Sequence, residues 1–201
     1  MFRKYGTLAL LGDVQIGKTA LMIKYVNDTY DPHYKKTEGV NFMEKTIELD
    51  QTDIRFSIYD LGGSKEFENM LPLATQDAIS VCFLFDLTRR ESLENVKNWW
   101  KLVKLSSRNS NAIPVLIGTK YDIFLEMPKE HQSYVHSRSI QFAKSLKSSL
   151  IFISTSDSIN VQKVFKILIS KSFDLKLTIP EFFRIGEPIL IHSTATLDSV
   201  L

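Results

Sequence analysis

Short apolar runs alternate along the chain with longer stretches in which apolar residues recur every three or four positions. The runs predict buried strands and the longer stretches predict helices that cover a sheet, so the fold class is α/β. The six expected strands span residues 7–12, 41–49, 54–60, 79–86, 113–119 and 150–155. Only residues 50–53 separate the second strand from the third, too few for a crossover. We therefore expect a mixed sheet, parallel except for one antiparallel hairpin at its edge.

Four helical stretches carry one-sided apolar stripes, which are expected to face the sheet. Leu21, Met22, Tyr25 and Val26 form the first stripe, and Leu93, Val96, Trp100 and Val103 form the second. Two further helices are expected over about 132–147 and from Asn160 to about Asp174. Thr88 and Glu91 have the spacing of a capping box, which predicts where the second helix begins.

A C-terminal extension follows the last predicted helix. We divide the chain into a domain over residues 1–175 and an extension over residues 176–201. Pro180 and Pro188 interrupt the extension, but it is rich in large apolar residues, so part of it is expected to pack on the domain or on a partner. It contains no cysteine, and Phe2 stands where N-myristoylation needs glycine, so no lipid anchor is expected.

Composition and charge mainly exclude functions. The 201 residues include 25 Lys and Arg and 23 Asp and Glu, with a formal net charge of +2 and no basic tract, so nucleic acid is not an expected partner. The single cysteine, Cys82, falls within a predicted strand, where a core residue is a better interpretation than a reactive thiol. No apolar run is long enough for a signal peptide or a membrane span, and we expect an intracellular monomer.

The segment GDVQIGKT, residues 12–19, has the pattern G-x-x-x-x-G-K-[ST] between a predicted strand and a predicted helix. Its glycines let successive backbone N–H groups and the helix N-terminus face a β-phosphate. Lys18 is expected to add positive charge to the β- and γ-phosphates, and the Thr19 hydroxyl to bind Mg²⁺. The predicted nucleotide-binding residues of this segment are Asp13, Val14, Gln15, Ile16, Gly17, Lys18, Thr19 and Ala20. The alternative is a glycine turn with an exposed lysine.

Two further segments end predicted strands. In IYDLGG, Asp60 is placed to hold Mg²⁺ through water. In IGTKYD, Asp122 is expected to accept hydrogen bonds from N1–H and the N2 amino group of guanine, a pair that adenine lacks, while Lys120 lies along the base. Each segment alone is more typical of a turn or an exposed loop. Both follow the phosphate loop in the order that a guanine-nucleotide site requires.

Together these segments resemble the Ras superfamily of small GTPases over residues 5 to about 175. The resemblance implies a P-loop fold that binds GTP and GDP with Mg²⁺ and hydrolyses GTP. It implies that Thr37, in TEGVNF, binds Mg²⁺ and senses the γ-phosphate, that Tyr30 lies against the guanine, and that the Gly63 N–H meets the γ-phosphate. The further base-binding residues that it implies are Thr119, Thr155 and Ser156.

Within that superfamily, segments such as GVNF, NMLPLAT and FLFDLTR resemble the fungal septum-promoting and mitotic-exit GTPases. That subgroup also has threonine at the position of Thr119 and ends without a prenylated cysteine. The resemblance implies a cytoplasmic, spindle-pole-associated switch that recruits a protein kinase cascade when GTP-bound. It also implies that an effector kinase, a GTPase-activating protein and a scaffold read switch I, residues 33–40, and switch II, residues 62–75.

Four residues depart from the family pattern, and two of them, Val14 and Gln15, stand at loop positions where Ras itself has glycines. Ser64 replaces the glutamine that orients the attacking water; with Thr37 and Gly63 it is assigned to the catalytic positions, and slow hydrolysis is expected because serine is too short. Asp157 stands where the base loop usually has lysine.

Three other functions stay open at this point. They are a scaffold that stays GTP-bound, a Rab-like trafficking GTPase and a metabolic P-loop kinase. The base-selecting TKYD and the absence of a lid-like arginine cluster count against the kinase.

Overall fold

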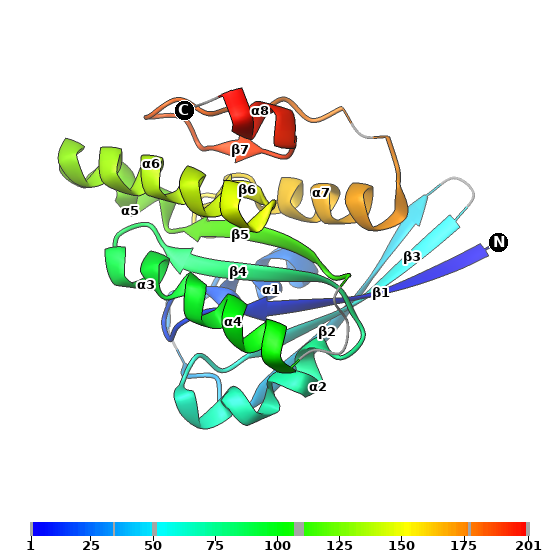
Figure 1. The fold of residues 1–201 in the computed structure, drawn as a ribbon. Coiled ribbons are helices and arrows are strands. Elements are labelled where there is room, and N and C mark those ends of the chain that lie inside the picture. Colours follow the sequence, from blue (N-terminus) through cyan, green and yellow to red (C-terminus); the bar gives the residue numbers. More distant parts are fainter. Residues whose placement is uncertain (1, 34, 50–51, 107–110, 177, 200–201) are drawn as a thin grey trace.

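The computed structural model describes residues 2–33, 35–49, 52–106, 111–176 and 178–199. Within these ranges the strands form one seven-stranded sheet in the order β2-β3-β1-β4-β5-β6-β7, and helices cover both of its faces (Figure 1). The strands are β1 (Phe2–Leu11), β2 (Val40–Leu49), β3 (Thr52–Leu61), β4 (Ala78–Asp86), β5 (Ile113–Thr119), β6 (Ser149–Phe152) and β7 (Leu190–Ile191).

The helices are α1 (Lys18–Asn27), α2 (Leu71–Thr75), α3 (Arg90–Glu94), α4 (Val96–Ser106), α5 (Tyr121–Leu125), α6 (Lys129–Leu146), α7 (Val161–Phe173) and α8 (Thr194–Ser199). A 3₁₀ helix, η1 (Lys65–Met70), precedes α2. The predicted third and fourth helices correspond to α6 and α7.

The six predicted strands are confirmed, and so is the hairpin. β2 pairs antiparallel with β3 from Val40↔Leu61 to Leu49↔Thr52, whereas β1, β4, β5 and β6 continue the sheet in parallel. The middle of the predicted connection, residues 50–51, lies outside the described residues. β1 is longer than expected because its first half pairs with β3 from Phe2↔Thr52 onward. The parallel order places the carboxyl ends of β1, β3, β4, β5 and β6 at one edge.

The C-terminal extension adds a seventh strand, which the prediction of six strands missed. β7 pairs antiparallel with β6 through Leu150↔Ile191 and Ile151↔Leu190. Ile189, Leu190 and Ile191 are completely buried, so this part of the extension packs on the domain. The strand is two residues long and follows Pro188, and its length gives too little alternation to recognise. It forms because β6 would otherwise expose unpaired backbone groups.

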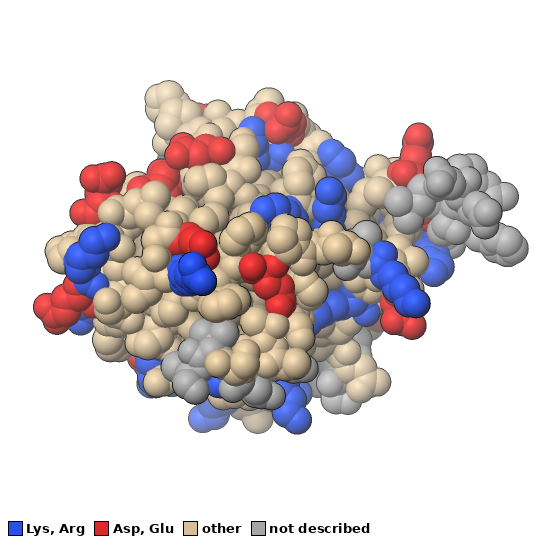
Figure 2. All heavy atoms as spheres, turned by 90° about the horizontal axis from the view of Figure 1, so that it is seen from above, with Lys and Arg blue, Asp and Glu red and all other residues tan. Residues whose placement is uncertain are grey.

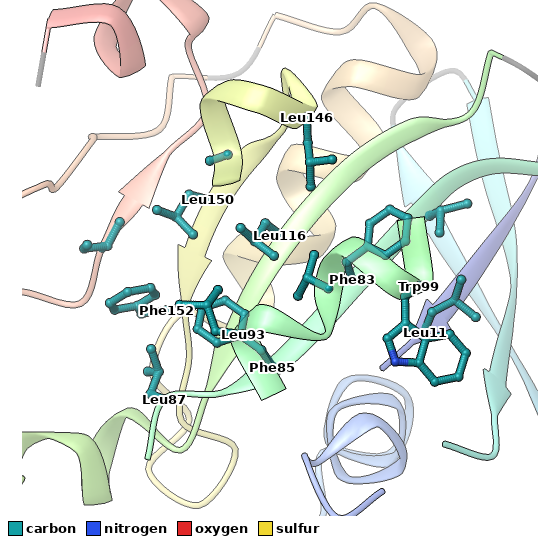
Figure 3. Close-up of a cluster of buried hydrophobic side chains, with 14 of the residues drawn as sticks. Leu11, Phe83, Phe85, Leu87, Leu93, Trp99, Leu116, Leu146, Leu150 and Phe152 are labelled. Carbon is teal, nitrogen blue, oxygen red and sulfur yellow. The ribbon is translucent and has the colours of Figure 1, made fainter. Parts of the chain in front are cut away.

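The apolar side chains form two clusters, one on each face of the sheet. One cluster contains Phe83, Phe85, Trp99 and Phe152 and is drawn in Figure 3. The other cluster contains the buried apolar side chains of α1 and α7. Cys82 is fully buried in this second cluster, and burial raises the pKa of its thiol to about 12, as expected of a core residue.

The second predicted helix differs from its prediction in two respects. It is divided into α3 and α4, and Trp99 is the buried tryptophan, at 6% exposure, where the stripe predicted Trp100. The capping box is wrong, because the Asp86 carboxylate takes both Thr88 donors instead. The Thr88 N–H and hydroxyl donate to Asp86 Oδ1 at 2.9 and 2.7 Å.

The molecular surface carries charges of both signs. Seen from above the view of Figure 1, acidic and basic side chains alternate without a large single-sign area (Figure 2). None of the helices in the described part of the chain combines the length and the apolar content needed to cross a membrane.

Candidate functional site

A cavity of about 650 Å³ opens where the phosphate loop meets the carboxyl ends of β3, β5 and β6. Its volume is in the range typical of small-molecule sites. The predicted residues that line it are Val14, Gln15, Ile16, Gly17, Lys18, Thr19, Ala20, Tyr30, Thr37, Gly63, Thr119, Lys120, Asp122, Thr155 and Ser156. Asp13, Asp60 and Ser64, which were also predicted, do not line it. The members of this set are spread from Val14 to Ser156 along the chain, and the parallel sheet brings them together.

The phosphate loop encloses the Lys18 ammonium group. Lys18 is only 5% exposed, and its Nζ donates to the carbonyls of Gly12 and Asp13 at 2.8 and 2.7 Å. Burial lowers the pKa of Lys18 to about 8, although the nearby carboxylates of Asp60 and Asp13 oppose this shift. An anion bound in the loop would therefore meet a poorly solvated cation.

Backbone geometry explains a glycine of this loop. Gly12 has φ +144°, and a Cβ there would lie 2.4 Å from the carbonyl oxygen of Leu84. Gln15 adopts φ 61°, a left-handed conformation unusual for a residue with a side chain. The loop thus depends on a close approach to β4 that only glycine permits.

Three predicted metal-binding side chains converge beside Lys18. Thr19 Oγ1 lies 2.5 Å from Asp60 Oδ2 and 2.8 Å from Thr37 Oγ1, and Thr37 Oγ1 lies 3.3 Å from the same carboxylate oxygen. Asp60 is fully buried, and its Oδ1 has no hydrogen-bond partner among the described residues. Burial raises the pKa of Asp60, whereas hydrogen bonds from Thr19 and Thr37 and the charge of Lys18 lower it.

This oxygen set fits Mg²⁺, which prefers hard oxygen ligands and usually shares them with substrate phosphates and water. The orphaned oxygen of Asp60 is the specific observation, because a buried carboxylate oxygen without a donor needs a cation or water. The described residues contain no group of three or more His, Cys, Asp or Glu suited to a metal. A metal here would accordingly be held by Thr19, Thr37 and Asp60 together with phosphate oxygens.

The opposite end of the cavity contains the residues predicted to bind the base. Lys120 and Asp122 line it at the start of α5, and Thr155 and Ser156 line it from the loop after β6. Asp157 does not line the cavity; its N–H donates to Ser154 Oγ at 3.1 Å. The family pattern predicts that Asp157 lies near the base. In the structure Asp157 is outside the cavity lining, so any effect of its charge on a bound base would be indirect.

Thr119 joins the two ends of the cavity. Its hydroxyl donates to the carbonyl of Ile16 in the phosphate loop at 2.6 Å and lies 3.1 Å from the carbonyl of Phe85. Thr119 is 2% exposed. Its side chain therefore positions the loop, and its contribution to nucleotide binding passes mainly through the backbone.

The sequence analysis missed Asp86, which holds two cations at the rim of the cavity. Asp86 is 1% exposed, and its Oδ2 lies 2.7 Å from Lys120 Nζ and 3.1 Å from Arg89 Nε. Arg89 also donates from Nη2 to the Val14 carbonyl at 2.9 Å. Burial would raise the pKa of Asp86, but hydrogen bonds from Lys120 and Thr88 hold it below its ordinary value. The sequence feature that could have identified Asp86 is its position as a carboxylate at the end of a buried strand.

Asp13 faces away from the cavity, toward α3 and α4. Its two carboxylate oxygens accept hydrogen bonds from Trp99 Nε1 at 2.9 Å and Asn95 Nδ2 at 3.0 Å. Asp13 therefore anchors the phosphate loop from behind and can reach a nucleotide only through its backbone.

The predicted switch segments contact each other. The Gly62 N–H donates to the Gly39 carbonyl at 2.8 Å, and Lys36 Nζ lies 2.7 Å from Glu66 Oε1. Gly63 packs on the phosphate loop so closely that a Cβ would lie 2.3 Å from the carbonyl carbon of Asp13. Within switch I, Tyr34 lies outside the described residues. The two segments thus share one edge of the cavity.

Ser64 is half-buried and directly precedes η1. It does not line the cavity. The side chain at this position is therefore not part of the cavity wall in this conformation.

Comparison with known proteins gives one consistent result. Residues 7–174 match the Ras family. The chain is 50% identical over 183 residues to Septum-promoting GTP-binding protein 1 of Schizosaccharomyces pombe, which covers 91% of each chain. It is 29% identical over 184 residues to the Ras-related protein Rab-18 of Caenorhabditis briggsae, covering 90% of this chain and 88% of that one. These matches include the phosphate loop, both switch segments and the base-binding loops, and the chain belongs to the Ras family of small GTPases.

Proposed function

We propose that this protein is a GTP-dependent switch in septation and mitotic exit, which recruits a protein kinase when GTP is bound. The observation that carries the proposal is the cluster of Thr19, Thr37 and Asp60, which joins the phosphate loop to switch I. Asp122 lines the same cavity as Thr19 and Thr37. The septation role is supported by the name of the Schizosaccharomyces pombe relative and by the sequence resemblance.

The residues of the chain explain how a γ-phosphate would be sensed. Bound Mg²⁺ would neutralise phosphate charge. Thr37 belongs to switch I but lies against Thr19 of α1, so a ligand shared by both hydroxyls would hold residues 33–40 in place. Gly63 lies against the phosphate loop, and the Gly39–Gly62 hydrogen bond couples the two switches. Loss of the γ-phosphate would release both segments together.

Members of the Ras family hydrolyse GTP, and we propose that this member does so slowly. Positioning and electrostatics account for nearly all of this catalysis, so the residue after Gly63 must reach the attacking water. Ser64 is short and lies outside the cavity lining. The same observation favours a second candidate, a binding scaffold that stays GTP-bound.

The proposed partners are an effector protein kinase, a GTPase-activating protein and a scaffold, all reading switches I and II. Spindle-pole association in the cytoplasm belongs to the proposal and rests on the resemblance alone. A Rab-like trafficking role is the alternative that the Rab-18 relatives raise, and their lower identity of 27–29% makes it the weaker one.

Single-turnover phosphate release from GTP-loaded protein tests the catalytic part. We expect Ser64→Gln to hydrolyse GTP faster than the wild type, chiefly with an activating partner, because its amide reaches further and has a second donor. Ser64→Ala is the matched control and should equal the wild type, since neither side chain reaches the water. If the wild type is already faster than Ser64→Gln, another residue positions the water. No hydrolysis over hours by the wild type would support the scaffold.

A further inference from the structure

The side chain of Asn160 connects the C-terminal extension to the start of the base loop, residues 153–158. Asn160 directly precedes α7 and is 7% exposed. Its Nδ2 donates to the Phe152 carbonyl at 2.9 Å and to the Pro188 carbonyl at 3.2 Å. Phe152 ends β6 immediately before the base loop, and Pro188 lies in the extension just before β7. One amide group therefore connects the extension to the start of the base loop.

The chemistry of this contact fixes the orientation of the Asn160 amide. Both neighbours are carbonyl oxygens, which only accept hydrogen bonds, and the two hydrogens of one NH₂ group serve one acceptor each. Asn160 also has φ 56°, a conformation that asparagine adopts more readily than most residues. Replacement of this side chain would leave buried carbonyls with one donor fewer.

The backbone at Phe152, whose carbonyl Asn160 contacts, is held by the extension and by the base-reading segment. The Phe152 N–H donates to the Ile189 carbonyl at 2.8 Å, and the Ile153 carbonyl accepts from the N–H of Tyr121, next to Asp122, at 3.0 Å. In Figure 1, β7 lies beside β6 and connects to α8. The base loop and Asp122 thus share one hydrogen-bonded support, and the extension forms its outer layer.

We propose that Asn160 is a positioning residue through which the docked C-terminal extension holds the base loop, and that it slows release of guanine nucleotide. The inference rests on the proposed guanine site. There, Asp122 would accept from N1–H and N2 of guanine, and the adjacent 6-oxo group needs a donor. The base loop lines that end of the cavity through Thr155 and Ser156. A base loop that moves would lose the hydrogen bond to the 6-oxo group while the phosphate contacts persist.

The test uses the full chain with Mg²⁺ and two nucleotides, GDP and the diphosphate of 2-aminopurine riboside, which keeps the 2-amino group but lacks the 6-oxo group and the N1–H. Asn160→Gly removes the amide and keeps a residue that tolerates positive φ. We expect Asn160→Gly to release GDP about ten-fold faster, because the hydrogen bond between the base loop and the 6-oxo group would be lost. The same variant should release the analogue at nearly the wild-type rate. Asn160→Asp, which cannot donate to two carbonyls, should behave likewise and serves if the glycine variant folds poorly.

Two controls separate positioning from general destabilisation. Asp174→Gly changes a residue with φ 52° at the opposite end of the same helix, α7, and should leave the ratio of the two release rates unchanged. Glu181→Ala loosens the extension beyond β7, because its Oε1 accepts from the His192 and Ser193 N–H groups at 2.7 Å. It should shift the ratio in the same direction as Asn160→Gly, by a smaller factor.

The outcomes that overturn the inference differ from those that overturn the guanine site. If Asn160→Gly accelerates both nucleotides equally, or neither, the residue is only structural. If Glu181→Ala leaves the ratio of the GDP and analogue release rates unchanged while Asn160→Gly raises it, the extension has no part in holding the loop. If the wild type itself releases both nucleotides at one rate, the proposed base site fails.

Discussion

The buried carboxylate of Asp86 connects the phosphate loop to the base end of the cavity, and Asp86→Asn should weaken both stability and nucleotide retention. The substitution keeps the size of the side chain and removes its charge. Lys120 and Arg89 would lose their common partner, and the new NH₂ group would direct hydrogens toward two cations. Arg89 would then hold the Val14 carbonyl less firmly.

The expected loss of stability follows from burial. Removing one partner of a buried pair costs about 3–5 kcal/mol when the remaining charge stays buried. The side chains of Lys120 and Arg89 are 34% and 39% exposed, so both can turn toward water, and we expect a smaller loss of about 2 kcal/mol. Release of GDP should be several-fold faster, because Lys120 lies at the base end of the cavity.

Urea unfolding at saturating GDP measures the first effect, and displacement of labelled GDP measures the second. Glu94→Gln is the matched control, because it breaks the more exposed ion pair between Glu94 and Arg138, whose side chains are 29% and 39% exposed. This substitution should lower the free energy of unfolding by about 1 kcal/mol or less. Equal stability of Asp86→Asn and Glu94→Gln, with unchanged GDP release, would refute the assigned role of Asp86.

The pH dependence has a definite sign. Because the folded-state pKa of Asp86 is lowered, its charge contributes stability above the ordinary value of 3.8, and this contribution is lost as the pH falls through the lower folded-state pKa. The stability difference between wild type and Asp86→Asn should therefore persist down to about pH 3.8 and shrink below it.

Two further predictions concern the two ends of the cavity. Lys18→Ala should remove most GDP affinity in a fluorescent-GDP titration. The GDP affinity of the wild type should fall as the pH rises above about 8, because binding favours the protonated ammonium of Lys18, whose pKa burial has lowered. A Lys18→Ala variant with the same pH profile as the wild type would contradict this. Asp122→Asn should shift preference from guanine toward xanthine in a competition between the two nucleoside diphosphates, because an amide offers a donor to the 2-oxo group; an unchanged preference would show that Asp122 does not read the base.

Local patterns in the sequence were sufficient for most of the fold and for the motifs of the site. Apolar runs and stripes report burial directly, so they predicted six strands, the edge hairpin and the four main helical regions. The phosphate loop, Asp60 and the TKYD segment were recognisable because each has a short, fixed spacing. The proximity of Thr19, Thr37 and Asp60 followed from the resemblance, and their distances came only with the structure.

Tertiary structure alone decided where several side chains point. Asp13 lies in the phosphate loop by sequence, yet Trp99 and Asn95 draw its carboxylate to the opposite side. Thr88 has the spacing of a cap, but the buried charge of Asp86 competes for its donors and wins. Such choices depend on partners that are distant along the chain, and no local pattern reports them.

The C-terminal extension shows the same division most clearly. Its apolar residues predicted burial, because large apolar side chains seldom remain fully solvated. Which surface would bury them was not encoded locally, since β7 consists of two residues and forms only because the edge of β6 offers unpaired backbone groups. The sequence by itself determined the phosphate loop and an extension too apolar to remain fully solvated, and it predicted a base-selecting carboxylate. Tertiary pairing decided that Asn160 joins that extension to the base loop, because a hydrogen bond between distant segments exists only after the sheet has assembled them.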